Sequence, residues 1–267
     1  MKTILGIAAV LGLVGALTVM KMGCTSGNDL AIKIFNQGLE NSKLKQFDKA
    51  IADYTKAIEL DPKLATAYSN RGIAYGGLKQ YNKTITDCTK AIELDPKFAE
   101  AYGVRGFAYY CLKNYDKAIT DHTKAIELEP NARAYTVRGY AYGGLKKYDK
   151  AITDHTKAIE LDPKFEDAYN HRGFSYFLLK QYDKAITDNT KAIELNPNNA
   201  QAYNDRGFSY LNLNLYDKAI TDHTKAIELN PNNAQAYNDR GDVYSIVGKN
   251  KEAEADYAKA KMLNEAN

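Results

Sequence analysis

Residues 99–130 read AEAYGVRGFAYYCLKNYDKAITDHTKAIELEP, and the chain repeats this stretch with small variations. Two amphipathic segments meet at a short break near Lys113 and Asn114. In each segment, small and apolar residues recur at spacings of three and four, which places them on one face of a helix. Pro130 ends the second segment, because proline lacks the amide hydrogen that a helix needs. The stretch therefore predicts a helical hairpin.

The hairpin recurs at a nearly constant period. The prolines of the chain follow one another at spacings of 34 residues, with one spacing of 33, and stand at Pro62, Pro96, Pro130, Pro163, Pro197 and Pro231. A single hairpin cannot bury its apolar face, so neighbouring hairpins are expected to stack into a solenoid. In the last hairpin, Glu254 and Lys261 replace the isoleucines of interior hairpins, which suits a solvent-facing end.

Each hairpin carries the same pattern of glycine, tyrosine, alanine and proline. In residues 99–130 the pattern consists of Gly106, Tyr109, Tyr115, Ala125 and Pro130. It resembles the tetratricopeptide repeat, and the resemblance covers residues 31–267. The resemblance implies an all-α fold, a right-handed superhelical solenoid of seven antiparallel helix pairs. The implied repeat array occupies residues 29–267, with repeats at about 31–64, 65–98, 99–131, 132–165, 166–199, 200–233 and 234–267.

An uncharged apolar run precedes the repeats. Residues 4–20 read ILGIAAVLGLVGALTVM between two lysines and predict one apolar helix, as a secretory signal or a short transmembrane anchor. We assign residues 1–28 to a signal peptide or membrane anchor with a short linker, and prefer the uncleaved anchor. Gly23-Cys24 is similar to a bacterial lipoprotein junction in which Cys24 would carry the lipid, and ordinary cleavage with secretion is the third alternative.

The basic start of this run favours export of the part that follows it. We therefore expect a membrane-associated protein whose repeats lie on the extracytoplasmic side. The net charge of the chain is +3, and the two lysines beside the run leave 3 − 2 = +1 for residues 29–267. Nucleic-acid-binding proteins usually show a clustered basic excess, so nucleic acid is not an expected partner. Three cysteines do not make a disulfide framework, which needs an even number.

Three histidines invite a metal-binding interpretation. His122, His155 and His223 occupy one equivalent position in different hairpins. Stacked helices lie roughly 10 Å apart, whereas the ligands of one zinc ion lie about 2 Å from it. Packing is therefore the better explanation of these histidines. The sequence also lacks a phosphate-binding glycine loop and a nucleophile with a nearby base, so we expect no enzyme activity, cofactor, metal or small-molecule substrate.

Two charged series run through the repeats. One consists of Arg71, Arg105, Arg138, Arg172, Arg206 and Arg240, where the related family commonly has leucine. The other consists of Asp53, Asp87, Asp121, Asp154, Asp188, Asp222 and Asp256. We expect a ladder of partly buried ion pairs, in which each arginine uses the aspartate of its own hairpin or of the preceding one. The alternative is an exposed arginine stripe for phosphates or acidic peptides, which matched aspartates would neutralise.

The resemblance also implies a binding face. Tetratricopeptide arrays usually bind partners through the second, fifth, ninth, twelfth and thirteenth positions of each first helix. The candidate partner-binding residues at these positions are Phe107, Tyr110, Tyr140, Asn170, Phe174, Phe177, Asn204, Phe208, Leu211 and Asn238. Large apolar residues that recur on an open surface are typical of an interaction site, but neighbouring repeats could instead cover some of them. No hairpin has the fifth-position lysine with which some members hold a C-terminal carboxylate.

These observations predict a membrane-tethered scaffold that binds a partner peptide or helix along a concave aromatic face. The alternative is a binder of a non-protein polymer, a glycan or a nucleic acid, through stacked aromatic side chains. The salt dependence of binding distinguishes a protein partner from a nucleic acid, because binding of phosphates weakens steeply with salt.

Overall fold

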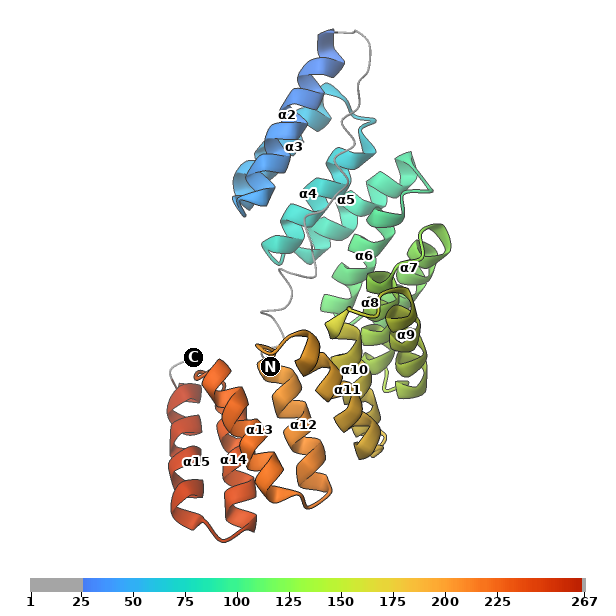
Figure 1. Cartoon of the computed structure of the whole chain (residues 1–267). Helices are drawn as coiled ribbons and strands as arrows, with labels where there is room; N and C mark the ends of the chain where they lie inside the picture. The colour runs from blue at the N-terminus through green and yellow to red at the C-terminus, as the bar shows by residue number, and fades with distance from the viewer. Residues whose placement is uncertain (1–25, 266–267) are drawn as a thin grey trace. The chain divides into compact units, whose positions relative to one another are not determined.

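The computed structural model describes residues 26–265, and all regular structure in this range is helical (Figure 1). The apolar run at residues 4–20 and the candidate lipid-attachment site at Cys24 lie outside the described residues. In chain order the helices are α2 (Ser26–Lys43), α3 (Phe47–Leu60), α4 (Ala65–Gly77), α5 (Tyr81–Leu94), α6 (Ala99–Cys111), α7 (Tyr115–Leu128), α8 (Ala132–Gly144), α9 (Tyr148–Leu161), α10 (Glu166–Leu178), α11 (Tyr182–Leu195), α12 (Ala200–Asn212), α13 (Tyr216–Leu229), α14 (Ala234–Ile246) and α15 (Asn250–Glu265). The all-α prediction is confirmed for this part of the chain.

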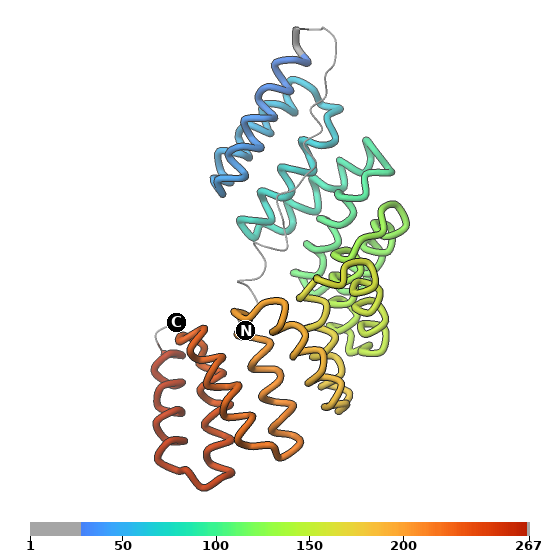
Figure 2. Tube along the Cα trace, in the orientation of Figure 1, coloured from blue at the N-terminus to red at the C-terminus, as the bar shows by residue number. Residues whose placement is uncertain are grey.

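The helices form hairpins within two units, which divide after Pro130. In the first unit α2 pairs with α3, α4 with α5, and α6 with α7. In the second unit the pairs are α8 with α9, α10 with α11, α12 with α13, and α14 with α15. Figure 2 traces these consecutive hairpins along the chain. Inside each unit, the second helix of one hairpin packs on the first helix of the next, and successive first helices also touch. This is the stacking that the 34-residue period predicts.

The break inside each hairpin is a left-handed residue. Lys79 follows the end of α4 and has a φ of 59°. The Lys79 amide donates to the Gly76 carbonyl at 2.9 Å, and the Gln80 amide donates to the Tyr75 carbonyl at 2.8 Å. These bonds satisfy carbonyls that the end of the helix leaves open. Lysine or asparagine holds this conformation in six turns, and Gly248 holds it in the last one.

The core of each hairpin depends on the close approach of its two helices. A Cβ atom at Gly139 of α8 would lie 2.6 Å from Cε1 of His155 on α9, so only glycine fits there. Gly106 with His122 and Gly207 with His223 repeat this relationship in their own hairpins. The three histidines therefore fill space against glycine inside separate hairpins, as the packing explanation predicts.

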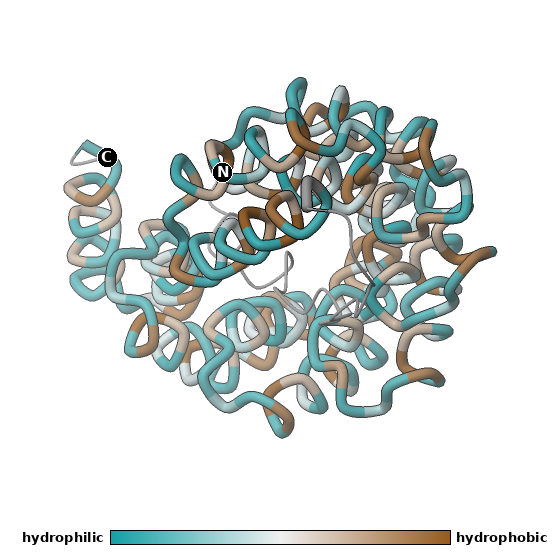
Figure 3. Tube along the Cα trace, turned by 90° about the horizontal axis from the view of Figure 1, so that it is seen from above, coloured by the Kyte–Doolittle hydropathy of each residue, from teal (hydrophilic) through white to brown (hydrophobic). Residues whose placement is uncertain are grey.

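The helices are amphipathic, and none of those described suits a bilayer interior. In Figure 3, hydrophobic and hydrophilic residues follow one another along the helices, the pattern expected of helices that bury one side. Among residues 26–265, no helix combines the length and the apolar composition that crossing a membrane requires.

Candidate partner-binding face

The arginine series forms a ladder of bidentate ion pairs. In α10, Arg172 donates from Nε to Oδ2 of Asp188 at 2.7 Å and from Nη2 to Oδ1 at 2.8 Å. The side chains of Arg172 and Asp188 are 17% and 6% exposed. Equivalent pairs join Arg71 to Asp87, Arg105 to Asp121, Arg138 to Asp154, Arg206 to Asp222 and Arg240 to Asp256. The predicted ladder is confirmed, and each arginine uses the aspartate of its own hairpin.

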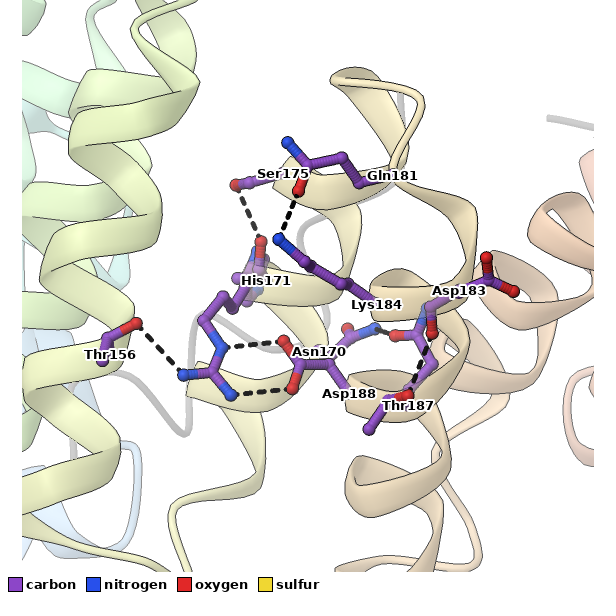
Figure 4. A network of polar contacts seen from close by, with 11 residues as sticks. Thr156, Asn170, His171, Ser175, Gln181, Asp183, Lys184, Thr187 and Asp188 are labelled. Carbon is purple, nitrogen blue, oxygen red and sulfur yellow. Dashed lines mark hydrogen bonds and ion pairs between the residues drawn. The ribbon is translucent and has the colours of Figure 1, made fainter.

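The third guanidinium nitrogen reaches the preceding hairpin. Arg172 Nη1 donates to the Thr156 hydroxyl of α9 at 3.1 Å. In Figure 4 the guanidinium lies between Thr156 on one side and Asp188 on the other, and dashed lines mark its bonds to both. The guanidinium also lies 5.7 Å from the ring centre of Tyr169, within the range of a cation–π contact. The same threonine and tyrosine contacts hold Arg71, Arg105, Arg206 and Arg240. These arginines therefore join hairpins and are not available to an acidic ligand.

The first-helix face of the second unit carries an aromatic strip. We use the name first-helix face for the sides of α8, α10, α12 and α14 that hold the second, fifth, ninth, twelfth and thirteenth repeat positions. The aromatic strip lies on α10 and α12 of this face and consists of Phe174, Phe177, Leu178, Phe208 and Leu211. Phe174 is 43% exposed and Leu178 is 37% exposed, which is unusual for large apolar side chains.

The rings of the strip contact one another across the two helices. Phe174 and Phe177 lie with ring centres 6.4 Å apart and planes at 18°, and Phe177 lies 6.0 Å from Phe208. Phe208 in turn meets the buried His223 edge-on at 5.4 Å. Aromatic pairs at these separations add to the energy of simple burial. The ring contacts and the packing of Phe208 on the buried His223 therefore hold the side chains of the strip in a fixed arrangement.

A layer of buried polar groups connects the first helices of the last three repeats. Asn170 of α10 donates from Nδ2 to Oδ2 of Asp205 on α12 at 3.0 Å. Asn204 of α12 makes the same bond to Asp239 on α14 at 2.9 Å. Both asparagines and both aspartates are buried. Because the same pair recurs one repeat later, these bonds fix the registration of three successive first helices.

The two aspartates in this layer are hydrogen-bonded by side-chain amides. Their second oxygens accept hydrogen bonds from side-chain amides, Gln201 at 2.7 Å for Asp205 and Gln235 at 2.6 Å for Asp239. Burial raises the pKa of each carboxyl to about 6, although the amide hydrogen bonds act in the opposite direction. A buried carboxylate that is compensated by amides alone is costly to ionise.

Aromatic and imidazole rings gather beside this layer. The rings of Tyr140 and His171 lie 4.2 Å apart between centres, and His155 lies 6.0 Å from His171. Burial lowers the pKa of His171 to about 4, so its imidazole is neutral near pH 7. Burial also lowers the pKa of His155, and the neighbouring His171 acts in the same direction. His155 is buried, so the half-buried rings of Tyr140 and His171 are the ones that extend the aromatic surface toward α8.

The structure places the predicted binding residues at different depths. Phe174 is exposed, and those that are half-buried are Tyr110, Tyr140, Phe177, Phe208, Leu211 and Asn238. Phe107 is only 7% exposed, and Asn170 and Asn204 are 5% and 3% exposed. These last three offer little surface to a partner, and the two asparagines instead position the neighbouring first helices.

The sequence reasoning did not single out Asp205, Asp239 or Asp242. They stand at the sixth and ninth positions of the last two first helices. The available signal was a change of residue type at a repeat position. The ninth position holds Phe174 and Phe208 in the two preceding repeats and Asp242 in the last one.

Solved structures show where this architecture occurs. One of them, YrrB, is described as a TPR protein with an unusual peptide-binding site. It is 25% identical to this chain and superposes with a TM-score of 0.55, and the match covers 68% of this chain and 95% of YrrB. MamA is 28% identical, with a TM-score of 0.55 over 60% of this chain and 95% of that one. A tetratricopeptide repeat protein from Parabacteroides merdae has a TM-score of 0.70 over 88% of this chain and 93% of that one, and its 19% identity supports the fold alone. No curated protein matches the chain.

Sequence profiles of repeat families cover most of the chain. The tetratricopeptide repeat profile matches residues 65–98, 99–131, 132–165, 166–199 and 200–233. Two further profiles, described as TPR repeat and tetratricopeptide repeat, match residues 38–79 and 224–255. The fourteen described helices fit about seven such repeats. The chain belongs to the tetratricopeptide repeat family.

Proposed function

We propose that this protein is a membrane-tethered scaffold that binds a partner peptide or helix through the first-helix face of its second unit. The observation that carries the proposal is the exposure of the aromatic strip, with 43% of Phe174 and 37% of Leu178 open to solvent. Proteins rarely leave a contiguous row of large apolar side chains exposed without a partner. A solved relative with a peptide-binding site supports the same use of the fold.

The packing beneath the strip supports a rigid binding surface. Phe177 contacts Phe208 across α10 and α12, and the Asn170–Asp205 bond joins the same two helices. A surface that is already ordered loses little conformational entropy when a partner binds. An extended segment or an amphipathic helix could bury its apolar side chains between the rings of the strip.

The binding experiment uses the full chain with Phe174→Ser and Phe208→Ser. The matched control is Leu161→Ser, because Leu161 belongs to the same unit, is 45% exposed and lies at the end of α9 outside the strip. Burying one large apolar side chain is worth about 1.5–3 kcal/mol. We therefore expect the double variant to recover at least ten-fold less partner in a pull-down, while the control matches wild type. Equal recovery by all three proteins would remove the strip from the binding site.

Salt separates the protein-binding function from phosphate binding. An apolar peptide or helix should remain bound when the salt concentration is raised several-fold, whereas nucleic acid should dissociate. Loss of all captured material at high salt, with recovery unaffected by the serine substitutions, would favour the polymer alternative.

Residues 4–20 support the tether, because they form an uncharged run long enough to reach into a bilayer. Membrane fractionation of the full chain should place it in the pellet, and deletion of residues 4–20 should release it. Cys24→Ser distinguishes the two kinds of tether, since only a lipid-anchored protein would lose its attachment. We place the repeats on the extracytoplasmic side, and protease treatment of intact cells or spheroplasts would digest them there.

A further inference from the structure

The charged residues of the first-helix face in the second unit are mostly acidic. Asp167 holds the second position of α10, and Asp205 and Asp239 lie buried beside the face at the sixth positions of α12 and α14. Asp242 is exposed on α14. Arg133 of α8 is the basic residue of this face. Burial raises the pKa of Asp167 and the charge of Arg133 acts in the opposite direction, so these two groups offset each other. Asp242 therefore gives the face a local negative charge, although residues 29–267 carry a net charge of +1.

The arginines of the same helices do not cancel this charge. Arg172, Arg206 and Arg240 point to the second helices, where each binds an aspartate with two hydrogen bonds. Each of these pairs is neutral as a whole. The exposed carboxylate of Asp242 remains outside these pairs, so its field acts on whatever approaches the end of the aromatic strip.

Asp242 stands where the aromatic series ends. Phe174, Phe208 and Asp242 occupy the ninth position of three successive first helices, α10, α12 and α14. These helices touch one another in order. A segment that lies across them therefore meets two phenylalanines and then a carboxylate. Asp242 Oδ1 accepts a hydrogen bond from the Tyr257 hydroxyl at 2.9 Å, which holds the carboxylate in place on the exposed surface.

From this arrangement we infer that the first-helix face selects a cationic partner segment, with apolar or aromatic side chains for the strip on α10 and α12 and a lysine or arginine for Asp242 on α14. The inference rests on the proposed function, because it names the chemistry of the partner at that same site. Two independent attractions favour a cation there. The carboxylates attract it through charge, and the faces of the aromatic rings attract it through their quadrupoles.

The surrounding charge makes this selection specific. Residues 29–267 carry a net charge of +1, so a general negative charge of the repeats does not explain the binding of a cationic peptide. An acidic segment would meet the exposed Asp242 with a charge of the same sign. It would also bring its charges near the two buried carboxylates. Like charges at an interface suppress binding of the wrong partner.

A random peptide library, displayed and selected on the full chain, tests this inference. We expect the selected peptides to combine large apolar residues with lysine or arginine, relative to the starting library. Selection of apolar peptides that are neutral or acidic would overturn the charge inference and leave the proposed function intact. If the Phe174→Ser, Phe208→Ser chain selects the same peptides as wild type, or if neither selects any, the proposed function itself fails.

Asp242→Asn then tests the position of the cation. The control is Asp217→Asn, which removes an exposed carboxylate from α13 of the same unit outside the face. For a selected basic peptide, we expect Asp242→Asn to weaken binding roughly two- to five-fold, the range for one exposed ion pair. Asp217→Asn should leave binding unchanged. Equal effects of the two substitutions would contradict the assignment of the cation to Asp242.

Discussion

Asn170 donates a hydrogen bond to the carboxylate of Asp205 in the next repeat, and both side chains are buried. Asn204 and Asp239 repeat the bond one step later. Each asparagine thus compensates a carboxylate that belongs to a different hairpin. Asn238 occupies the same position in the repeat at residues 234–267, but its side chain is only half-buried. The asparagine series is therefore buried and bonded to the next repeat at Asn170 and Asn204, and more open at Asn238.

Asn170→Ala should destabilise the protein. It leaves oxygens of the buried Asp205 and Asn189 without their amide donor, and an uncompensated buried acceptor costs about 1–3 kcal/mol. Asn238→Ala is the matched control and should change the free energy of unfolding by less than about 0.5 kcal/mol. Urea denaturation of the two variants checks this difference. Equal losses in both would show that the bond to Asp205 is not the source of the effect.

Arg172→Leu should lower the melting temperature clearly. The substitution strands the nearly buried Asp188 without its bidentate partner, and breaking a buried pair in this way costs about 3–5 kcal/mol. Partial exposure of the arginine places the expected loss at the low end of this range. A second substitution, Asp188→Asn, removes the stranded charge and should restore part of the stability. The explanation fails if the double variant melts no higher than Arg172→Leu alone.

The period of the sequence was sufficient to predict the hairpins and the ion-pair ladder. It could not say which aspartate each arginine binds, because both candidates recur with the same period. The answer depends on the turn between the helices, which brings Asp188 to Arg172 and leaves Thr156 of the preceding hairpin to the remaining nitrogen. Sequence positions likewise could not distinguish the buried Asn170 from the exposed Phe174, since exposure depends on how each helix rotates against its neighbours.

The pH dependence of stability should be shallow in the wild type, because two sets of groups oppose each other. Burial raises the pKa of Asp205 and Asp239 from 3.8 to about 6, so between these values the folded state binds more protons than the unfolded state. Their contribution to stability therefore grows as the pH falls from 7 to 4. Burial lowers the pKa of His171 and His223 from 6.5 to about 4, so their contribution falls over the same window.

Substitution separates the two contributions. Asp205→Asn with Asp239→Asn removes the acid-stabilised groups, and the free energy of unfolding should then fall steeply between pH 6.5 and 4. In the variant with His171→Asn and His223→Asn, the free energy of unfolding should instead rise as the pH falls over the same window. Asparagine is the chosen replacement because it already fills the equivalent positions at Asn70 and Asn189. Denaturation curves at several pH values measure both slopes. Identical pH profiles for the two double variants would exclude these groups as the source.

Two glycines of α8 should respond to alanine with opposite signs. A Cβ atom at Gly139 would lie 2.6 Å from the buried His155 ring, so Gly139→Ala overpacks the hairpin and should cost about 1–3 kcal/mol. A Cβ atom at Gly143 would meet nothing within 4 Å. Gly143→Ala therefore keeps only the gain in helix propensity and should stabilise by about 0.5–1 kcal/mol. Because both substitutions add the same methyl group to the same helix, their melting temperatures isolate the close approach of α8 and α9. Destabilisation by both to the same extent would show that the contact with His155 is not what requires glycine at position 139.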